Sequence, residues 1–174
     1  MIQPVLITER LSLRPFVRSD AADVQRLAGD ERIADVTANI PYPYPDGLAE
    51  EWISGHQLGW KVGTRASFAI THRENGVLLG AISLMHIADE EAEIGYWLGV
   101  DGWGKGYATE ACCEILRFAR ENLRLVRVHA RVLARNPASG RVLEKAGMRH
   151  IGLEEGACGY RNACESIELY ELRF

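Results

Sequence analysis

The segment DGWGKGYATEA, residues 101–111, contains glycines spaced as in a turn that could bind phosphate. Gly102, Gly104 and Gly106 come directly before a segment with the apolar period of a helix. The free amides of a first helical turn and the positive end of the helix dipole attract anions, and glycine lets an anion approach the backbone closely. Phosphate binding is one interpretation. An ordinary strand-to-helix turn is the other, and the turn alone does not separate them.

Two common phosphate motifs do not fit this segment. A P-loop requires GxxxxGK[ST], a pattern that does not occur in the chain. The dinucleotide fingerprint GxGxxG requires an acidic residue at the end of the next strand. The segment instead reads GxGxG, and the next strand ends in RVLARN without an acid. A nicotinamide-dependent enzyme is therefore disfavoured.

The elements around the turn predict a single α/β domain, residues 1–174, with a mixed and mostly antiparallel sheet. Alternating apolar residues predict strands at 6–16, 92–100, 126–134, 165–174 and around 148–155, and a hairpin over 67–87 that turns at Asn75-Gly76. Helical periods and caps predict helices at 18–29, from residue 48 onward, at 106–123 and at 136–147. The prolines of 40–47 predict an irregular loop.

Composition limits the class of protein. The 174 residues are 47% hydrophobic and carry a formal net charge of −4, so a broad nucleic-acid-binding surface is not expected. Cys112, Cys113, Cys158 and Cys164 lack the paired CxxC spacing of a metal site, and we expect buried or partly buried thiols and no metal. The N-terminus lacks a signal-peptide layout and no apolar run is long enough to span a membrane. We therefore expect a cytoplasmic protein.

Two motifs in this order resemble the GCN5-related N-acetyltransferase (GNAT) family. They are AEIGYWLGVDGWGKGYATEA, residues 92–111, and NPASGRVLEKAGM, residues 136–148. The opening ITERLSLRPFVRSDAADVQRLAGDERI and the loop IPYPYP are similar to the RimJ/RimL branch, which acetylates N-termini of ribosomal proteins. The resemblance covers nearly the whole chain. In that family the turn holds the pyrophosphate of coenzyme A in a Q/R-x-x-G-x-G/A pattern. Gly106 and Ala108 match it, and Trp103 replaces Gln or Arg.

The resemblance implies acetyl transfer from acetyl-CoA to a primary amine by direct attack in a ternary complex. It also implies a GNAT-like central sheet with flanking helices, in which strands near 96–100 and 132–135 splay apart around the pantetheine arm. The cofactor-binding residues that it implies are Leu98, Val100, Gly104, Lys105, Gly106, Tyr107, Ala108, Thr109, Asn136 and Ser139.

The resemblance also implies candidate catalytic residues. Asn136 and Ser139 match the family's NxxS motif, in which the serine would protonate the leaving sulfur. Glu93 stands where some relatives carry a catalytic base. Each has a plainer interpretation: a helix N-cap, an exposed helix serine and a solvated strand-end carboxylate. Leu143 occupies the position at which many relatives carry a tyrosine that acts as the general acid, and Ile151 replaces a second glutamate of the family.

The acceptor is less well defined by the sequence. The resemblance suggests a peptide N-terminus or a small amine such as an amino acid, and a homodimer. Tyr42, Tyr44 and Trp52 could form a substrate wall or pack the first helices onto the sheet. His129 falls on the polar face of its strand, where a single histidine is usually structural or solvated. The alternative function is a non-catalytic acyl-CoA binding or sensing module.

Overall fold

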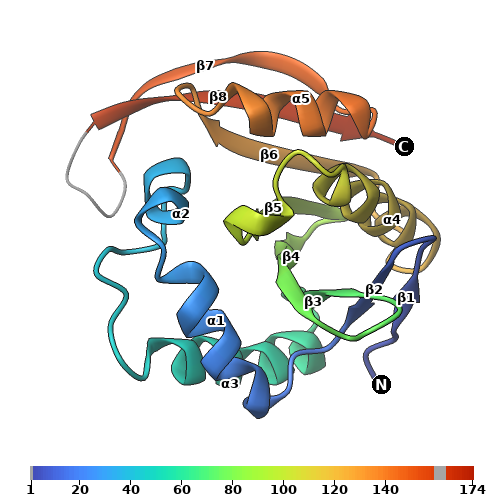
Figure 1. Ribbon diagram of the computed structural model, residues 1–174. Helices are drawn as coiled ribbons and strands as arrows, with labels where there is room; N and C mark the ends of the chain where they lie inside the picture. Colours follow the sequence, from blue (N-terminus) through green and yellow to red (C-terminus); the bar gives the residue numbers. More distant parts are fainter. Residues whose placement is uncertain (1, 159–163) are drawn as a thin grey trace.

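The computed structural model describes residues 2–158 and 164–174, with side chains described for 2–155 and 165–174. These residues form an eight-stranded sheet in the order β1-β2-β3-β4-β5-β6-β8-β7, surrounded by helices (Figure 1). The strands are β1 (Leu6–Ile7), β2 (Leu11–Arg14), β3 (Ala66–His72), β4 (Leu78–Ala88), β5 (Glu91–Leu98), β6 (Arg127–Leu133), β7 (Arg149–Cys158) and β8 (Cys164–Arg173). Only the β5–β6 pair is parallel among them, so the predicted mixed, mostly antiparallel sheet is confirmed.

The helices differ from the prediction mainly near the N-terminus. They are α1 (Ala21–Ala28), α2 (Glu31–Val36), α3 (Leu48–Val62), α4 (Tyr107–Glu121) and α5 (Pro137–Lys145), with 3-10 turns η1 (Arg18–Asp20) and η2 (Val100–Gly102). The predicted helix over 18–29 is correct for α1, but α2 was not predicted. This helix has only six residues, too few for a helical period to stand out, and begins where Asp30 accepts a hydrogen bond from the Arg32 amide.

The strand predicted over 6–16 is confirmed at 11–14, which is β2, but it is not one continuous strand. The segment forms the β1–β2 hairpin, because Thr8 closes a tight turn with Leu11. The Thr8 amide donates to the Leu11 carbonyl oxygen at 3.0 Å, and the Leu11 amide donates to Thr8 Oγ1 at 2.9 Å. The Thr8 hydroxyl accepts a hydrogen bond that a backbone carbonyl would otherwise accept, and the alternation of apolar residues does not predict such a side-chain contact.

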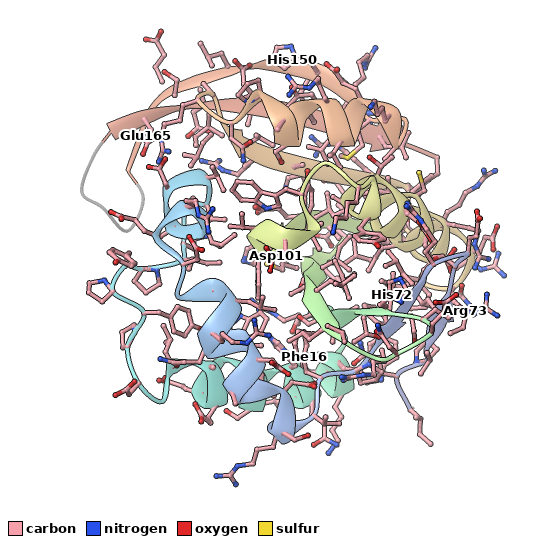
Figure 2. All side chains as sticks on the ribbon, in the orientation of Figure 1. Phe16, His72, Arg73, Asp101, His150 and Glu165 are labelled. Atoms are coloured by element: carbon pink, nitrogen blue, oxygen red, sulfur yellow. The ribbon has the colours of Figure 1, made fainter. Side chains whose placement is uncertain are left out.

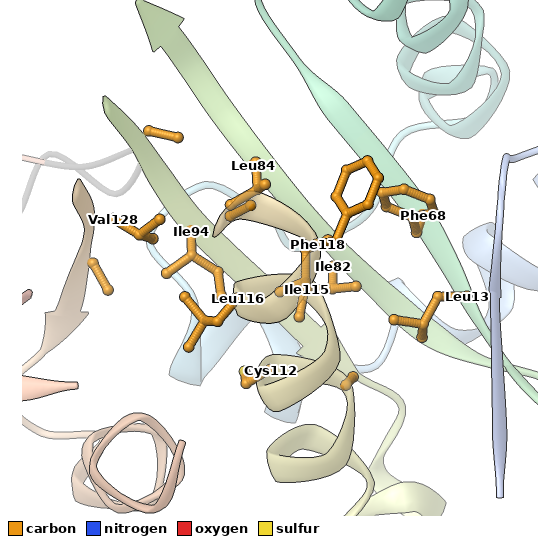
Figure 3. Close-up of a cluster of buried hydrophobic side chains, with 14 of the residues drawn as sticks. Leu13, Phe68, Ile82, Leu84, Ile94, Cys112, Ile115, Leu116, Phe118 and Val128 are labelled. Atoms are coloured by element: carbon orange, nitrogen blue, oxygen red, sulfur yellow. The ribbon is translucent and has the colours of Figure 1, made fainter. Parts of the chain in front are cut away.

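The main core lies between α4 and one face of strands β2 to β6. Figure 3 shows Leu13, Phe68 and Ile82 facing Ile115 and Phe118 of α4. The alternation predicted for β5 is confirmed, since Ala92, Ile94 and Leu98 are buried toward this helix. The packing holds the start of α4 rigidly at the end of β5.

A second, smaller core covers the opposite face of the sheet under α1 and α3. Val24, Ala28, Ile53 and Ala69 are buried there, and partly buried aromatic residues pack against them. These aromatic residues are Phe16, Tyr44, Trp52 and Trp97. Tyr44 and Trp52 therefore do pack the first helices onto the sheet, whereas half of the Tyr42 side chain is exposed.

His56 on α3 is a buried histidine without a hydrogen-bond partner among the described residues. Only 5% of it is exposed, and neither ring nitrogen has a partner. The rings of Trp52 and Phe16 lie 4.3 Å and 5.3 Å from its ring, and Figure 2 labels Phe16 beside α3. Burial, helped by the positive charge of Arg65, lowers the pKa of His56 to about 4. The folded protein therefore keeps this imidazole neutral.

Because the pKa of His56 is lowered, we expect the free energy of unfolding to fall in mild acid. The unfolded chain takes up a proton below a pKa of about 6.5 and the folded chain does so only below about 4, so stability falls as pH drops between these values. Between pH 7 and 4.5, wild type should lose ~2.5 kcal/mol more unfolding free energy than His56→Leu. Urea denaturation at both pH values measures the difference, and equal losses in the two proteins would contradict the assignment.

Candidate active site

Strands β5 and β6 open a cavity in the middle of the sheet. They pair only at Glu91–Glu93 with Arg127–His129, and diverge beyond that point. The diverging segments 94–98 and 130–133 line a cavity of about 920 Å³. On their other edges, β5 pairs with β4 and β6 pairs with β8. The facing edges therefore offer backbone amides and carbonyls to an extended ligand that lies between them.

The cavity has two sides, which we name by their helices. The α4–α5 side contains the glycine turn and α5, and the α1–α3 side lies under the first three helices (Figure 1). The α4–α5 side includes Gly102, Gly104, Gly106, Tyr107, Ala108, Thr109, Asn136, Ser139, Arg141, Leu143 and Lys145. The α1–α3 side includes Val24, Ile33, Val36, Ile40, Tyr44, Trp52, Arg65, Met85 and Glu93.

The glycine turn has the geometry of an anion cradle. Gly104 and Gly106 have φ values of +72° and +80°, in the left-handed region that favours glycine. Gly106 is the N-cap of α4 and supplies no side chain to cap the first amides. The indole Nε1 of Trp103 donates to the Leu98 carbonyl oxygen at 2.9 Å, which holds the turn against the end of β5. The first amides of α4 are thus left for a ligand.

Most of the predicted cofactor-binding residues lie together around this turn. Leu98, Gly104, Gly106, Tyr107, Ala108, Thr109, Asn136 and Ser139 all line the cavity. Two predicted residues are not among its lining: Val100 is half-buried in η2, and Lys105 is exposed at the surface. Arg141 and Lys145, which the sequence analysis missed, line the cavity one helical turn apart on α5 and supply positive charge there.

The β1–β2 hairpin neutralises an acidic side chain at the start of α4. Glu110 accepts hydrogen bonds from Thr8 Oγ1 at 2.6 Å and Arg10 Nε at 2.7 Å, and Arg10 also donates to the Lys105 carbonyl oxygen. Burial alone would raise the pKa of Glu110, but these hydrogen bonds lower it below its usual range. The pairing reduces the repulsion that an unpaired carboxylate would exert on an anion at the turn.

Asn136 caps α5 and connects it to α2. Its side-chain oxygen accepts from the Ser139 amide at 3.2 Å, which confirms the N-cap interpretation, and its Nδ2 donates to the Val36 carbonyl oxygen at 3.0 Å. The neighbouring Arg135 donates to the Asp35 carbonyl oxygen and pairs with Glu165, which Figure 2 shows on β8 close to α2. The cavity wall formed by α2 is thereby fixed to the far half of the sheet.

Ser139 lies beside a tyrosine that the sequence analysis did not select. The hydroxyl of Tyr96 is 2.7 Å from Ser139 Oγ and 3.1 Å from the Ser139 carbonyl oxygen. Burial raises the pKa of Tyr96 far above its usual value, so the phenol stays protonated. Leu143, at the position where relatives carry tyrosine, is fully buried. Tyr96 alternates onto the same side of β5 as Ala92, Ile94 and Leu98, so the sequence pattern alone does not indicate its contact with Ser139.

Glu93 lies at the point where β5 and β6 separate. Its side chain is 21% exposed, so it is not a freely solvated carboxylate. Its Oε2 is 3.4 Å from His86 Nδ1 and 3.9 Å from His129 Nε2, so His129 is not isolated. Burial lowers the pKa of His129, and the Glu93 carboxylate offsets part of that shift. Ile151 lies on β7 and is not among the residues that line the cavity.

Other classes of site are less well supported by the described residues. Across residues 2–158 and 164–174, no cluster of three or more His, Cys, Asp or Glu side chains is arranged to hold a metal ion. Over the same residues, none of the helices combines the length and hydrophobicity that a membrane span requires. Cys112 is a buried free thiol, as expected, but Cys113 is exposed, which corrects the expectation for that thiol. The side chains of Cys158 and Cys164 lie outside the described part.

The geometry fits a long ligand with an anionic head and an extended arm, as in coenzyme A. The family model described as the acetyltransferase (GNAT) domain matches residues 10–149. The N-acetyltransferase p20 of Bacillus licheniformis is 29% identical over 150 residues, covering 85% of this chain and 84% of its own.

Solved structures have the same fold. RimL, a ribosomal L7/L12 alpha-N-protein acetyltransferase solved with coenzyme A, has a TM-score of 0.88 and 18% identity, with 98% of each chain covered. Spermidine N-acetyltransferase from Vibrio cholerae, solved with coenzyme A and spermine, has a TM-score of 0.81 and 18% identity over 95% of this chain and 96% of its own. The family match and the left-handed glycine turn together establish that this chain belongs to the GNAT acetyltransferase family, with acetyl-CoA as its co-substrate.

Proposed function

We propose that this N-acetyltransferase acetylates a primary amine, with Glu93 as proton acceptor and Ser139 as proton donor. The observation that carries the proposal is that both side chains line one cavity, which passes between the diverging strands. Acetyl-CoA, when bound, supplies the acetyl group as an activated thioester. The turn amides and the facing edges of β5 and β6 would bind its head and arm, and Arg141 and Lys145 would add positive charge near the phosphates.

Glu93 would accept the proton that a protonated amine must lose before it can attack. An α-amino group has a pKa of about 8, so a large share is protonated at neutral pH and a nearby base raises the reactive fraction. His86 and His129 lie beside the carboxylate and offer sites to which the proton can pass next. Only His129 is partly shielded from solvent by burial, while His86 is 72% exposed and can return the proton to water.

Ser139 would donate a proton to the sulfur of coenzyme A as it leaves the acetyl group, on the α4–α5 side of the cavity. The Tyr96 phenol lies within hydrogen-bond distance of both Ser139 Oγ and the Ser139 carbonyl oxygen. Because the phenol stays protonated, it can donate to the serine and hold the hydroxyl in one orientation. Tyr96 is thus proposed as a positioning residue and Ser139 as the group that transfers the proton.

We expect Ser139→Ala to lower kcat by about 10- to 100-fold, while the Kd for coenzyme A changes less than about threefold. Tyr96→Phe should lower kcat by a smaller factor, because the serine hydroxyl remains but loses its partner. Release of free thiol measures turnover, and calorimetry measures binding. Ser54→Ala, at an exposed position of α3, is the matched control and should leave both values unchanged. Unchanged turnover in Ser139→Ala would remove serine from this role.

The reaction itself is tested by incubating the protein with acetyl-CoA and a panel of amines while thiol release is followed. Turnover of at least one amine above background supports acetyl transfer. A non-catalytic acyl-CoA binding module, the alternative, predicts a higher melting temperature with coenzyme A and no turnover of any amine. Three further points remain predictions: the class of acceptor, a homodimer and a cytoplasmic location. Sedimentation measures the oligomeric state and so tests the homodimer.

A further inference from the structure

Arg65 supplies positive charge on the α1–α3 side of the cavity, where the amine would bind. Its side chain lines the cavity, is half-buried, and forms no ion pair with any described side chain. Two other charged residues that line the cavity are paired: Arg131 with Glu154 at 2.9 Å, and Glu165 with Arg135 at 2.6 Å. A partly desolvated guanidinium without a counter-ion favours an anionic ligand.

The sheet register places Arg65 on the same row as Glu93. Arg65 directly precedes Ala66, which pairs with Leu84, so Arg65 comes level with Met85 on β4. Met85 in turn pairs with Glu93 on β5. Residues level with one another share a face, and two strand spacings separate Arg65 and Glu93 by roughly 10 Å between their Cα atoms. Both residues line the same cavity, and Met85 lies between them on the row.

The walls between these two charges are apolar. Trp52, Tyr44 and Ile40 line this side of the cavity, and the Met85 methyl group lies over Gly95, 2.8 Å from where a Cβ would stand. A ligand held at both ends by charge would therefore place its side chain against aromatic and aliphatic groups. A polyamine would instead bring a second positive charge toward Arg65.

We propose that the acceptor is a small amine that also carries a carboxylate, namely a free amino acid with an apolar side chain. The ammonium lies at Glu93, and the carboxylate pairs with Arg65, whose planar fork of N–H donors suits a carboxylate. This inference rests on the proposed acetyl transfer. It distinguishes the free amino acid from a peptide N-terminus, which has a neutral amide where the carboxylate would be.

The test compares L-leucine with L-leucinamide, 3-methylbutylamine, spermidine and a leucine-initiated tetrapeptide amide at pH 8. The kcat/KM for leucine should exceed that for leucinamide by about 10- to 100-fold, the range expected for a charge-assisted pair. Leucinamide is the weaker base and has more free amine, so this preference would run against intrinsic reactivity. Arg65→Met should reduce the leucine-to-leucinamide ratio at least tenfold, and Arg65→Lys should retain part of it.

Controls separate recognition from folding and from the reaction itself. Arg65→Met keeps the aliphatic stem that packs on Gly59, and melting temperatures check the fold. Arg120→Met, an exposed arginine on α4, should leave the ratio unchanged. Equal use of leucine and leucinamide, preference for spermidine or the tetrapeptide, or an unchanged ratio in Arg65→Met would overturn the inference. If no amine is acetylated, the proposed reaction fails, and calorimetric binding of leucine against leucinamide to the coenzyme A complex still decides the role of Arg65.

Discussion

Replacing Gly106 with valine should weaken coenzyme A binding by two orders of magnitude or more. Gly106 has a φ of +80°, where a β-branched residue is strained by at least ~1–2 kcal/mol. A Cβ at this position would also lie 3.3 Å from an Arg10 guanidinium nitrogen. The added methyl groups would cover amides at the start of α4 that should bind the pyrophosphate. Both effects act on the same turn and add to the loss of affinity.

A matched glycine separates blocked binding from backbone strain. Gly63, the C-cap of α3, has a φ of +78°, and a Cβ at this position would meet open space, with nothing within 4 Å. Gly63→Val should therefore cost similar stability but leave coenzyme A binding unchanged. Calorimetry gives the two Kd values and thermal melting the two stabilities. Equal affinities in the two variants would place the phosphates away from this turn.

Replacing Glu93 with glutamine should reduce kcat by about 10²- to 10⁴-fold at pH 7, the usual contribution of a positioned general base. The amide keeps the shape of the side chain but cannot accept the proton. Coenzyme A affinity should hold, because the carboxylate lies on the α1–α3 side of the cavity, away from the glycine turn. With an acceptor whose amine has a pKa of about 8, such as a peptide α-amine, the defect should narrow above pH ~8, where that amine loses its proton to water without help.

The pH profile is the decisive measurement for Glu93. Initial rates of thiol release from pH 6.5 to 9, for wild type and Glu93→Gln with the same amine, give the two curves. Glu74→Gln, in the exposed turn between β3 and β4, is the control and should follow wild type. Parallel curves at all pH values would mean that Glu93 has a structural role, and overlapping curves would exclude it from the reaction.

The sequence predicts the site best where its geometry is local. Turns and helix caps are determined by residues that are close together in the sequence. This is why the left-handed glycines, the start of α4 and the Asn136 cap could be predicted. Strands β3 and β4, which are buried on both faces over most of their length, were predicted from the Asn75-Gly76 turn between them, and the later strands from alternation of apolar residues. Short elements such as α2 were not, because six residues cannot display a period.

Contacts between distant residues were not predictable in this way. Arg10 and Glu110 are 100 residues apart, and only the packing of α4 beside the β1–β2 hairpin brings them together. Tyr96 shares a side of β5 with apolar residues, and only the separation of β5 from β6 lets its hydroxyl reach Ser139. Arg65 shares a row with Glu93 through two strand registers, neither of which is encoded locally.

The short β5–β6 pairing gives the sheet a mechanical weak line. Strands β1 to β5 form one half-sheet and β6 to β8 another, joined in the sheet at three residue pairs. An extended ligand arm in the gap would hydrogen-bond to the free edges of both β5 and β6. Binding of the ligand and the stiffness of the connection between the two half-sheets are therefore thermodynamically linked. The connection between the half-sheets is expected to be most flexible when no cofactor is bound. Acceptor recognition then depends on the cavity wall formed by α2, which the hydrogen bond from Asn136 to Val36 connects to the second half-sheet.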